Sequence, residues 1–343
     1  MSDAQVGIIG AGPIGIELAV VLQRAGVSAV QFDAGTVGQT ITWYPRQVRF
    51  FSSPERIAIA GVPLHTADQS KATREEYLTY LRSVVEQFDL PIHTHERVTD
   101  IARDGGGYML SFFHCDGTHR DLHAFLIIAI ADILRPLQVG IPGEELPHVS
   151  HYFVEPDAYF RKRLVIVGGR NSAVEAALRC YRIGAHVTIS YRRDTFDRDS
   201  VKYWLWPEVE YLIDKGRIAY HPRTTPTAIT PTHITLAHTD TGRTSALPAD
   251  FVLLLTGYEM DASLFERAGV ELVGENRAPV FDESTMQTNV PGLYVAGTAT
   301  AGTQNRFKAF IETSHVHVDR IVAHLTGQRV QPARPEHESM PES

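Results

Sequence analysis

Apolar residues along the chain fall into short continuous runs and longer stretches with helical spacing. The runs at residues 6–9, 125–131 and 164–167 have the length and composition of buried strands. The first and third runs lead through glycines into stretches whose apolar residues recur every three or four positions, which predicts helices over residues 16–25 and 174–183. Strands that alternate with helices in this way are typical of an α/β protein with parallel sheets.

The clearest amphipathic helix is predicted over residues 73–88. Thr73 and Glu76 have the spacing of a capping box, in which each side chain binds the other residue's backbone N–H. The apolar face of this helix comprises Tyr77, Leu78, Leu81, Val84, Val85 and Phe88. Further strands are predicted over residues 29–32, 98–101, 108–113, 186–191 and 247–255, a hairpin turn over 105–107, and a closing helix over 307–325.

A glycine pattern G-x-G-x-x-G joins the first strand to the first helix. Gly10 allows a tight turn, Gly12 lets a diphosphate approach the backbone, and Gly15 lets helix and strand pack closely. The N–H groups at the start of the helix attract phosphate oxygens. The next strand ends in Asp33, 23 residues after Gly10, where a carboxylate can bind a pair of ribose hydroxyls. The predicted dinucleotide site comprises Gly10, Gly12, Pro13, Ile14, Gly15 and Asp33.

Aromatic and hydroxyl side chains are concentrated in the loop over residues 38–53, directly after this first strand-helix-strand unit. A flavin ring could be housed there, with Gln39, Thr40, Phe51 and Ser52 as candidate contacts. A packed aromatic loop without a ligand explains the same residues equally well.

A second unit of the same kind begins at residue 164, and its turn reads G-x-R-x-x-A. Arg170 stands where the second glycine is expected, and its side chain crowds a diphosphate unless it points away. The strand after the helix leads into Arg192 and Arg193 instead of an acid, and guanidinium groups suit the 2′-phosphate of NADPH. A solvated arginine pair is the alternative. The predicted NADPH-binding residues are Gly168, Gly169, Arg170, Asn171, Ser172, Ala173, Arg192, Arg193, Lys202 and Gly257.

Two dinucleotide turns of different character predict two different nucleotides, and the economical pairing is FAD in the first unit and NADPH in the second. Two crossover segments, at residues 136–143 and 256–260, predict that the second unit is inserted into the first, and they are candidate hinges. We therefore predict an α/β fold with two Rossmann-like, three-layer dinucleotide-binding domains. Its parts are a discontinuous FAD domain (1–137 and 256–327), an inserted NADPH domain (138–255) and a disordered tail (328–343).

The composition limits the functions open to this chain of 343 residues. A net charge of −8 gives no basic field for nucleic acid or anionic lipid, and no apolar run is long enough to cross a membrane. The 16 histidines are scattered without metal-ligand spacing, so we predict no metal site. The two cysteines, Cys115 and Cys180, suit a reducing compartment, and the first strand begins too close to Met1 to leave room for a signal peptide. We therefore predict a cytoplasmic protein.

With these motifs the chain resembles flavoproteins of the two-dinucleotide-binding-domain superfamily, in their thioredoxin-reductase-like branch, and within it the YpdA-type bacillithiol disulfide reductases. The similarity runs from about residue 6 to residue 325. The residues that carry it are Tyr44-Pro45, residues 50–53, 143–147, 151–153 and 168–173, Ser200-Val201-Lys202 with Trp204, and residues 288–292. The resemblance implies FAD and NADPH as cofactors, a homodimer, and a low-molecular-weight disulfide as substrate. It also implies that Gly297 and Thr298 close the FAD site.

The chain departs from these families at the positions of their sulfur chemistry. Thioredoxin reductases carry a CxxC motif before the strand of the NADPH unit, whereas residues 149–153 of this chain contain no thiol. The YpdA family offers a cysteine inside the first glycine turn, where this chain has Ile14. We predict that Cys115, on a strand, and Cys180, on a helix, are inert thiols. Residues 129–131, Thr298 in place of Asp, and Asp33 in place of Glu also differ from the family pattern and predict weaker FAD retention.

These observations predict an FAD-dependent NADPH oxidoreductase in which hydride passes from NADPH to the flavin and then to a small-molecule or small redox-protein acceptor. His317, which matches a histidine of the family, Glu312 and His151 are candidate proton donors, although each could equally be a structural residue. A flavin-dependent monooxygenase and a non-catalytic nucleotide-sensing flavoprotein are the alternatives.

Overall fold

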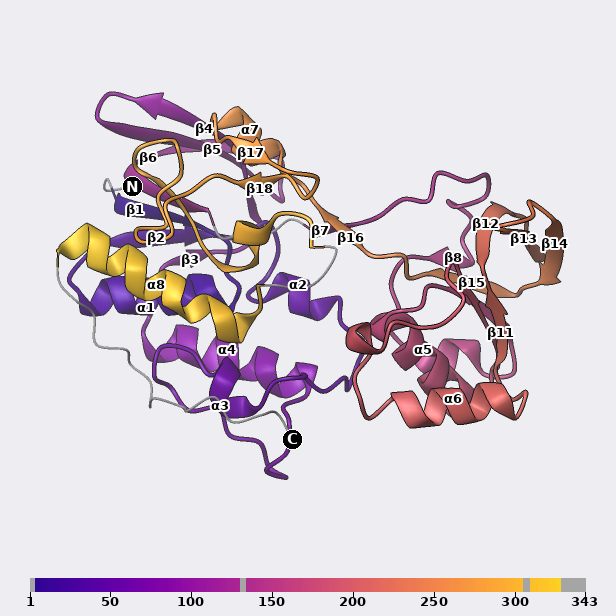
Figure 1. Cartoon of the computed structure of the whole chain (residues 1–343). Coiled ribbons are helices and arrows are strands. Elements are labelled where there is room, and N and C mark those ends of the chain that lie inside the picture. Colours follow the sequence, from indigo (N-terminus) through magenta and orange to yellow (C-terminus); the bar gives the residue numbers. More distant parts are fainter. Residues whose placement is uncertain (1–3, 130–133, 305–308, 328–343) are drawn as a thin grey trace. The chain divides into compact units, whose positions relative to one another are not determined.

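The computed structural model describes residues 4–129, 134–304 and 309–327 (Figure 1). The chain divides into two compact units. Unit 1 comprises Met1–Thr42, Gln47–Arg135 and Glu259–Ser343, and unit 2 comprises Trp43–Arg46 and Pro136–Tyr258. Unit 1 is therefore discontinuous in sequence. The assignment of Trp43–Arg46 to unit 2 is a feature that the sequence did not predict.

A seven-stranded sheet forms the centre of unit 1. Its parallel part orders β3 (Ile92–His93), β2 (Ala29–Phe32), β1 (Ala4–Ile9) and β6 (His119–Ala129), and β19 (Leu293–Val295) pairs with β6. An antiparallel hairpin of β4 (Glu96–Asp104) and β5 (Gly107–His114) continues from β6. Ile9 lies opposite Phe32 and Ala129 in the ladders, so β1, β2 and β6 end at the same edge of the sheet.

Helices α1 (Pro13–Arg24) and α8 (Ile311–Thr326) pack side by side in unit 1, with α4 (Arg74–Gln87) against α1 (Figure 1). The predicted capping box is confirmed, because Thr73 caps α4 and exchanges both hydrogen bonds with Glu76. The remaining elements of unit 1 are short. They are α2 (Gln39–Thr42), α3 (Pro54–Ile57), α7 (Ser263–Arg267), the 3₁₀ helix η3 (Gly297–Ala301), β17 (Leu272–Val273) and β18 (Ala278–Pro279).

Unit 2 is built on a second, parallel sheet with the order β11-β10-β9-β15-β8. Its strands are β11 (Ala219–Pro222), β10 (His186–Tyr191), β9 (Arg163–Val167), β15 (Phe251–Leu254) and β8 (Val149–Ser150). Helices α5 (Asn171–Arg182) and α6 (Trp206–Asp214), the 3₁₀ helices η1 (Pro156–Tyr159) and η2 (Arg198–Ser200), and an antiparallel sheet of β12 (Thr224–Ile229), β13 (His233–His238) and β14 (Thr244–Pro248) complete it. The two connecting segments contain β7 (Leu134–Pro136) and β16 (Tyr258–Met260), which pair with each other.

Several element predictions were wrong in detail. The strand expected over residues 247–255 is two strands in different sheets, since β14 ends at Pro248 and β15 begins at Phe251. Phe125, expected inside a buried strand, is 49% exposed, and Cys115 lies in the turn after β5 instead of on a strand. The closing helix begins at Ile311. Residues 130–131, 307–308 and the tail from 328 lie outside the described residues.

Candidate functional site

The first glycine turn leaves its backbone accessible. Helix α1 begins at Pro13 with Gly12 as its N-cap, and no side chain caps the first turn. A Cβ on Gly12 would meet nothing within 4 Å, whereas a Cβ on Gly15 would lie 2.1 Å from the carbonyl oxygen of Gly10. Gly10 itself has a φ of 113°. The turn thus combines a close helix–strand contact with an open approach to the N–H groups that bind phosphate.

Gln31, on β2, and Asp33, directly after it, bind the backbone of this turn. Asp33 accepts the N–H of Ala11 at 2.7 Å and that of Gly35 at 2.8 Å. Burial raises the pKa of Asp33, although these two N–H groups, His95 and Arg97 act in the opposite direction. The amide of Gln31, 1% exposed, donates to the carbonyl of Gly10 at 2.6 Å. Sequence reasoning missed Gln31, whose only signal is a polar residue in an apolar strand.

Residues outside the candidate flavin loop hold parts of it in place. Gln39 begins helix α2 and accepts the N–H of Thr36 at 3.0 Å, and Thr40 is half-buried beside it. Ser52 is buried, whereas Phe51 is 45% exposed with the ammonium of Lys71 5.0 Å from its ring centroid.

Gly297 and His317 connect the start of η3 to helix α8. The N–H of Gly297, a residue with φ of 68°, donates to Nδ1 of His317 at 3.1 Å. Burial, together with Arg320 and His315, lowers the pKa of His317 to about 4. His317 is therefore neutral at physiological pH, and Nε2 is its remaining donor. Thr298 follows in η3.

Glu312 lies in the first turn of α8. Its Oε2 is buried and has no hydrogen-bond partner among the described residues. A buried acceptor of this kind suits a bound group or water that supplies a proton. Its role as a proton donor remains a prediction.

The backbone conformation of the second glycine turn explains why the turn tolerates an arginine. Arg170 is the N-cap of α5 with φ −105° and ψ −175°, close to the −80° and −179° of Gly12, so its backbone does not require glycine. The residues that do require glycine are Gly168 and Gly169. A Cβ on Gly168 would lie 2.5 Å from the carbonyl of Leu255, and one on Gly169 2.4 Å from the ring of Tyr191. Asn171, Ser172 and Ala173 form the first turn of α5, which no side chain caps.

In the basic segment after β10, Arg192 and Arg193 are exposed, whereas Lys202 is largely buried in an ion pair. Lys202 pairs with Glu175 at 3.1 Å, and both side chains are largely buried. The backbone N–H of Lys202 donates to Oδ1 of Asn171 at 3.2 Å, which ties this segment to the start of α5. Arg192 is exposed, and Arg193 is exposed with Asp197 3.9 Å away. Arg198, further along the segment, is also exposed and lies 3.4 Å from Glu210.

His151 is bound into a loop of unit 2. Its Nε2 lies 3.2 Å from Oε1 of Glu144, whose carboxylate also accepts the N–H groups of Val139, Gly140 and Ile141. Burial raises the pKa of Glu144, but these three N–H groups and His151 outweigh it, and the pKa lies below its ordinary value. These contacts give His151 a structural role in the loop without requiring a catalytic one.

The two thiols lie in different surroundings. Burial raises the pKa of Cys180, on α5, to about 12. Cys115 is exposed, and its N–H donates to the carbonyl of His95, in the segment beside Asp33. In the part of the chain that the structure describes, no group of three His, Cys, Asp or Glu could hold a metal ion. No helix there is long and apolar enough to span a membrane.

A sequence profile of pyridine nucleotide-disulphide oxidoreductases matches residues 7–297. The chain belongs to this family. It is 34% identical to bacilliredoxin reductase Bdr of Bacillus subtilis over 320 residues, which cover 93% of the chain and 96% of that protein. It is 29% identical to a ferredoxin–NADP reductase of Ignicoccus hospitalis, with 88% and 90% covered. The structure of bacillithiol disulfide reductase Bdr (YpdA) from Bacillus cereus matches with a TM-score of 0.90 and 33% identity over 95% of this chain and 99% of that one.

These matches confirm the predicted resemblance to YpdA-type reductases and the two-domain α/β fold. The crystal structure of T. acidophilum thioredoxin reductase, 22% identical with a TM-score of 0.73, shares the fold. The chain is an NADPH-dependent flavoprotein oxidoreductase with FAD and NADPH as cofactors. The open approach at Gly12 and the uncapped first turns of α1 and α5 fit these two diphosphates.

Proposed function

We propose that the chain passes hydride from NADPH to FAD, and reducing equivalents from FAD to an acceptor, without using a cysteine of its own. The observation that carries the proposal is the state of the two thiols. A pKa of about 12 leaves Cys180 as an unreactive buried thiol. Cys115 adjoins the segment of Asp33, the expected ribose ligand, and so belongs to the adenosine end of the FAD site.

The residues around both turns support defined binding roles. The N–H groups at the start of α1 would bind the FAD diphosphate, and Asp33 its ribose. Arg192 and Arg193 would bind the 2′-phosphate of NADPH, while Glu175 holds Lys202 at the start of α5. His317 can donate only its Nε2 proton. FAD supplies the chemistry by accepting a hydride and returning electrons singly or in pairs.

The acceptor that fits these residues is a quinone or a small one-electron carrier such as a ferredoxin. Overall, NADPH, one proton and a quinone give NADP⁺ and hydroquinone, which balances without any enzyme thiol. The relative named ferredoxin–NADP reductase represents the one-electron carrier, whereas the relative named bacilliredoxin reductase represents the disulfide class of acceptor. With Ile14 in the glycine turn, no thiol is available there to open a disulfide substrate. The cytoplasmic location and a homodimer stay predictions.

Anaerobic stopped-flow absorbance at about 450 nm tests this proposal in the wild-type protein and in a C115S/C180A variant. We expect rapid bleaching with NADPH in both proteins and equal reduction of a benzoquinone. Loss of quinone reduction in the cysteine-free variant would show that a thiol takes part, provided that its FAD content and thermal stability are unchanged. Absence of bleaching in the wild type would favour the nucleotide-sensing alternative, and a C4a-hydroperoxide with oxygen would favour the monooxygenase.

The arginine pair has its own test. In R192A/R193A, we expect KM for NADPH to rise about 10- to 100-fold, because each lost charge-assisted contact contributes roughly 1.5–3 kcal/mol and partial solvent exposure reduces this. KM for NADH should hardly change. R182A removes an exposed arginine that pairs with Glu208 and serves as the matched control. Equal effects on NADPH and NADH would contradict a role in recognising the 2′-phosphate.

A further inference from the structure

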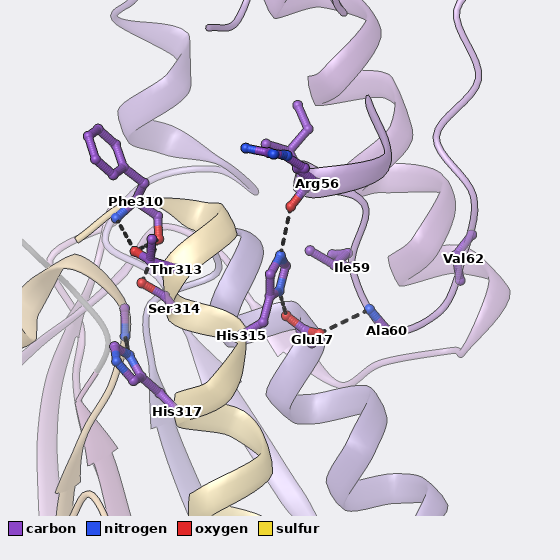
Figure 2. Close-up of polar contacts among 12 residues, drawn as sticks. Glu17, Arg56, Ile59, Ala60, Val62, Phe310, Thr313, Ser314, His315 and His317 are labelled. Atoms are coloured by element: carbon purple, nitrogen blue, oxygen red, sulfur yellow. Dashed lines mark hydrogen bonds and ion pairs between the residues drawn. The ribbon is translucent and has the colours of Figure 1, made fainter. Parts of the chain in front are cut away.

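Glu17 and His315 form a buried ionisable pair in the core of unit 1 (Figure 2). Glu17 lies on α1, two residues after Gly15, and His315 lies on α8, 298 residues further along the chain. Oε2 of Glu17 is 2.5 Å from Nδ1 of His315, and the two residues are 2% and 3% exposed. Neither belongs to a motif. Burying such groups costs free energy unless they are paired, so the pair calls for an explanation.

The partners of the pair determine where its protons lie. Nε2 of His315 is 2.9 Å from the carbonyl oxygen of Arg56, which can only accept, so Nε2 carries a proton. Oε1 of Glu17 accepts the N–H of Ala60 at 3.4 Å. At 2.5 Å, Nδ1 and Oε2 must share one further proton, since two bare lone pairs would repel. The pair is therefore neutral overall, whichever atom holds that proton.

The pair joins three separate segments of unit 1. Arg56 and Ala60 belong to the segment that follows the candidate flavin loop. Their contacts with His315 and Glu17 hold this segment against both helices. Helix α1 carries the glycine turn at its start. Helix α8 carries His317, which accepts the N–H of Gly297 on a different side from His315 (Figure 2). All three pieces that lead to predicted FAD contacts thus meet at one proton-sharing contact.

Other contacts fix this segment but do not link the three pieces. The hydroxyl of Tyr77 donates to the carbonyl of Ile57 at 2.8 Å, and the Tyr80 hydroxyl accepts the N–H of Ile59 at 2.7 Å, both from α4. Arg24 of α1 donates to the carbonyl of Ala60 at 2.9 Å. These contacts hold the segment in place when Glu17 is changed, so the loss of the pair is expected to shift the site without unfolding it.

We propose that Glu17 and His315 are positioning residues for FAD. Their shared proton sets the position of α8, and through His317 that of Gly297, relative to the first turn of α1. The same contact also fixes the position of the residues after Ser52 relative to the first turn of α1. The inference rests on FAD as the cofactor and is independent of NADPH and of the acceptor, so it can be tested without turnover.

Two single variants give the first test. In E17Q, the amide can donate to Nδ1 of a neutral His315 and accept from Ala60, so we expect an FAD dissociation constant within about threefold of the wild type. In E17L, both partners lose their contact. We expect E17L to weaken FAD binding at least tenfold, measured by titration of the full-length apoprotein with FAD, and to change the visible circular dichroism of the bound flavin. Unchanged affinity in E17L would overturn the proposal.

A double variant separates positioning from stability. E17L/H315L replaces the polar pair by apolar side chains and is expected to regain the apoprotein's thermal midpoint, as buried ion pairs often can be replaced in this way. FAD affinity should stay at least tenfold weaker, because the contact to Arg56 is gone. Recovery of FAD affinity together with stability would reduce the pair to a packing role. S190A/T224V, which removes a buried hydroxyl pair 2.8 Å apart in unit 2, is the matched control and should leave FAD affinity unchanged.

Discussion

Two histidines on helix α8, two positions apart, show how the surroundings decide what an imidazole can do. His315 shares a proton with a carboxylate and donates to a carbonyl, so it is satisfied on both nitrogens. His317 meets a backbone N–H at Nδ1, which holds that nitrogen in its unprotonated form. Of the two, only His317 keeps a ring N–H that no described residue accepts, so it can donate a hydrogen bond to a bound group.

The pKa of His317 predicts how stability depends on pH. The pKa is about 4 in the folded protein and near 6.5 when unfolded, so between these values the unfolded chain binds a proton that the folded protein does not. The free energy of unfolding should therefore fall by about 2 kcal/mol between pH 7 and pH 5 on account of this group. In H317Q, whose amide oxygen can accept the N–H of Gly297, this part of the decrease should vanish.

Thermal or urea unfolding at both pH values measures the difference. H119Q, a change at an exposed histidine, is the control and should keep the wild-type decrease. An H317Q protein that loses as much stability as the wild type would contradict a lowered pKa for His317.

At the residue level, the sequence predicts what depends on fixed spacing. Gly10, Gly15 and Asp33 have roles that follow from a motif, and the structure brings the three together. Glu17 and His315 could not be predicted, because their contact depends on the packing of two helices distant in sequence. The one available signal was a carboxylate within the run of residues 14–22 of α1, all of which are buried.

At the level of elements, loop 138–144 shows how a charged side chain can take the place of regular secondary structure. Glu144 accepts three successive backbone N–H groups, those of Val139, Gly140 and Ile141, and the ring of His151. A loop of this kind would otherwise leave buried polar groups without partners. The carboxylate thus shapes the first connection between the two units from within unit 2.

Removal of this carboxylate should destabilise the protein measurably. In E144A, the three N–H groups and His151 lose their acceptor, and we expect a loss of roughly 2–4 kcal/mol in the free energy of unfolding. Chemical denaturation measures this loss, and limited proteolysis should cut near residues 138–143. E145A changes the exposed neighbour and should have the stability of the wild type. A stable E144A would mean that the loop is held by other contacts.

Element boundaries were predictable where local chemistry marks them. The capping box at Thr73 fixed the start of α4, and β10 begins and ends at the predicted residues. The predicted strand over residues 247–255 failed because an apolar run carries no information about which sheet receives it. Pro248, which has no N–H to donate, ends β14, and Asp250 accepts from Arg163 where β15 begins.

At the scale of the whole molecule, the two dinucleotide turns predicted two nucleotide-binding units, and the sequence predicted both connections between them. The structure adds that these connections pair with each other through β7 and β16. It also assigns Trp43–Arg46 to unit 2, where Trp43 and Tyr152 lie 5.8 Å apart between ring centroids. The sequence does not indicate this assignment of Trp43–Arg46, because an aromatic loop can pack against either unit.

The paired connections lead to a prediction about turnover. Leu137 donates its N–H to the carbonyl of Gly257 at 3.0 Å, and the hydroxyl of Thr256 donates to the carbonyl of Leu137 at 3.1 Å. If the connections act as a hinge, a disulfide in L137C/T256C should slow NADPH-driven quinone reduction several-fold while FAD affinity stays unchanged. A reductant should restore the rate, and L137C alone should behave as the wild type. Full turnover with the disulfide formed would mean that hydride transfer and acceptor reduction need no movement at these connections.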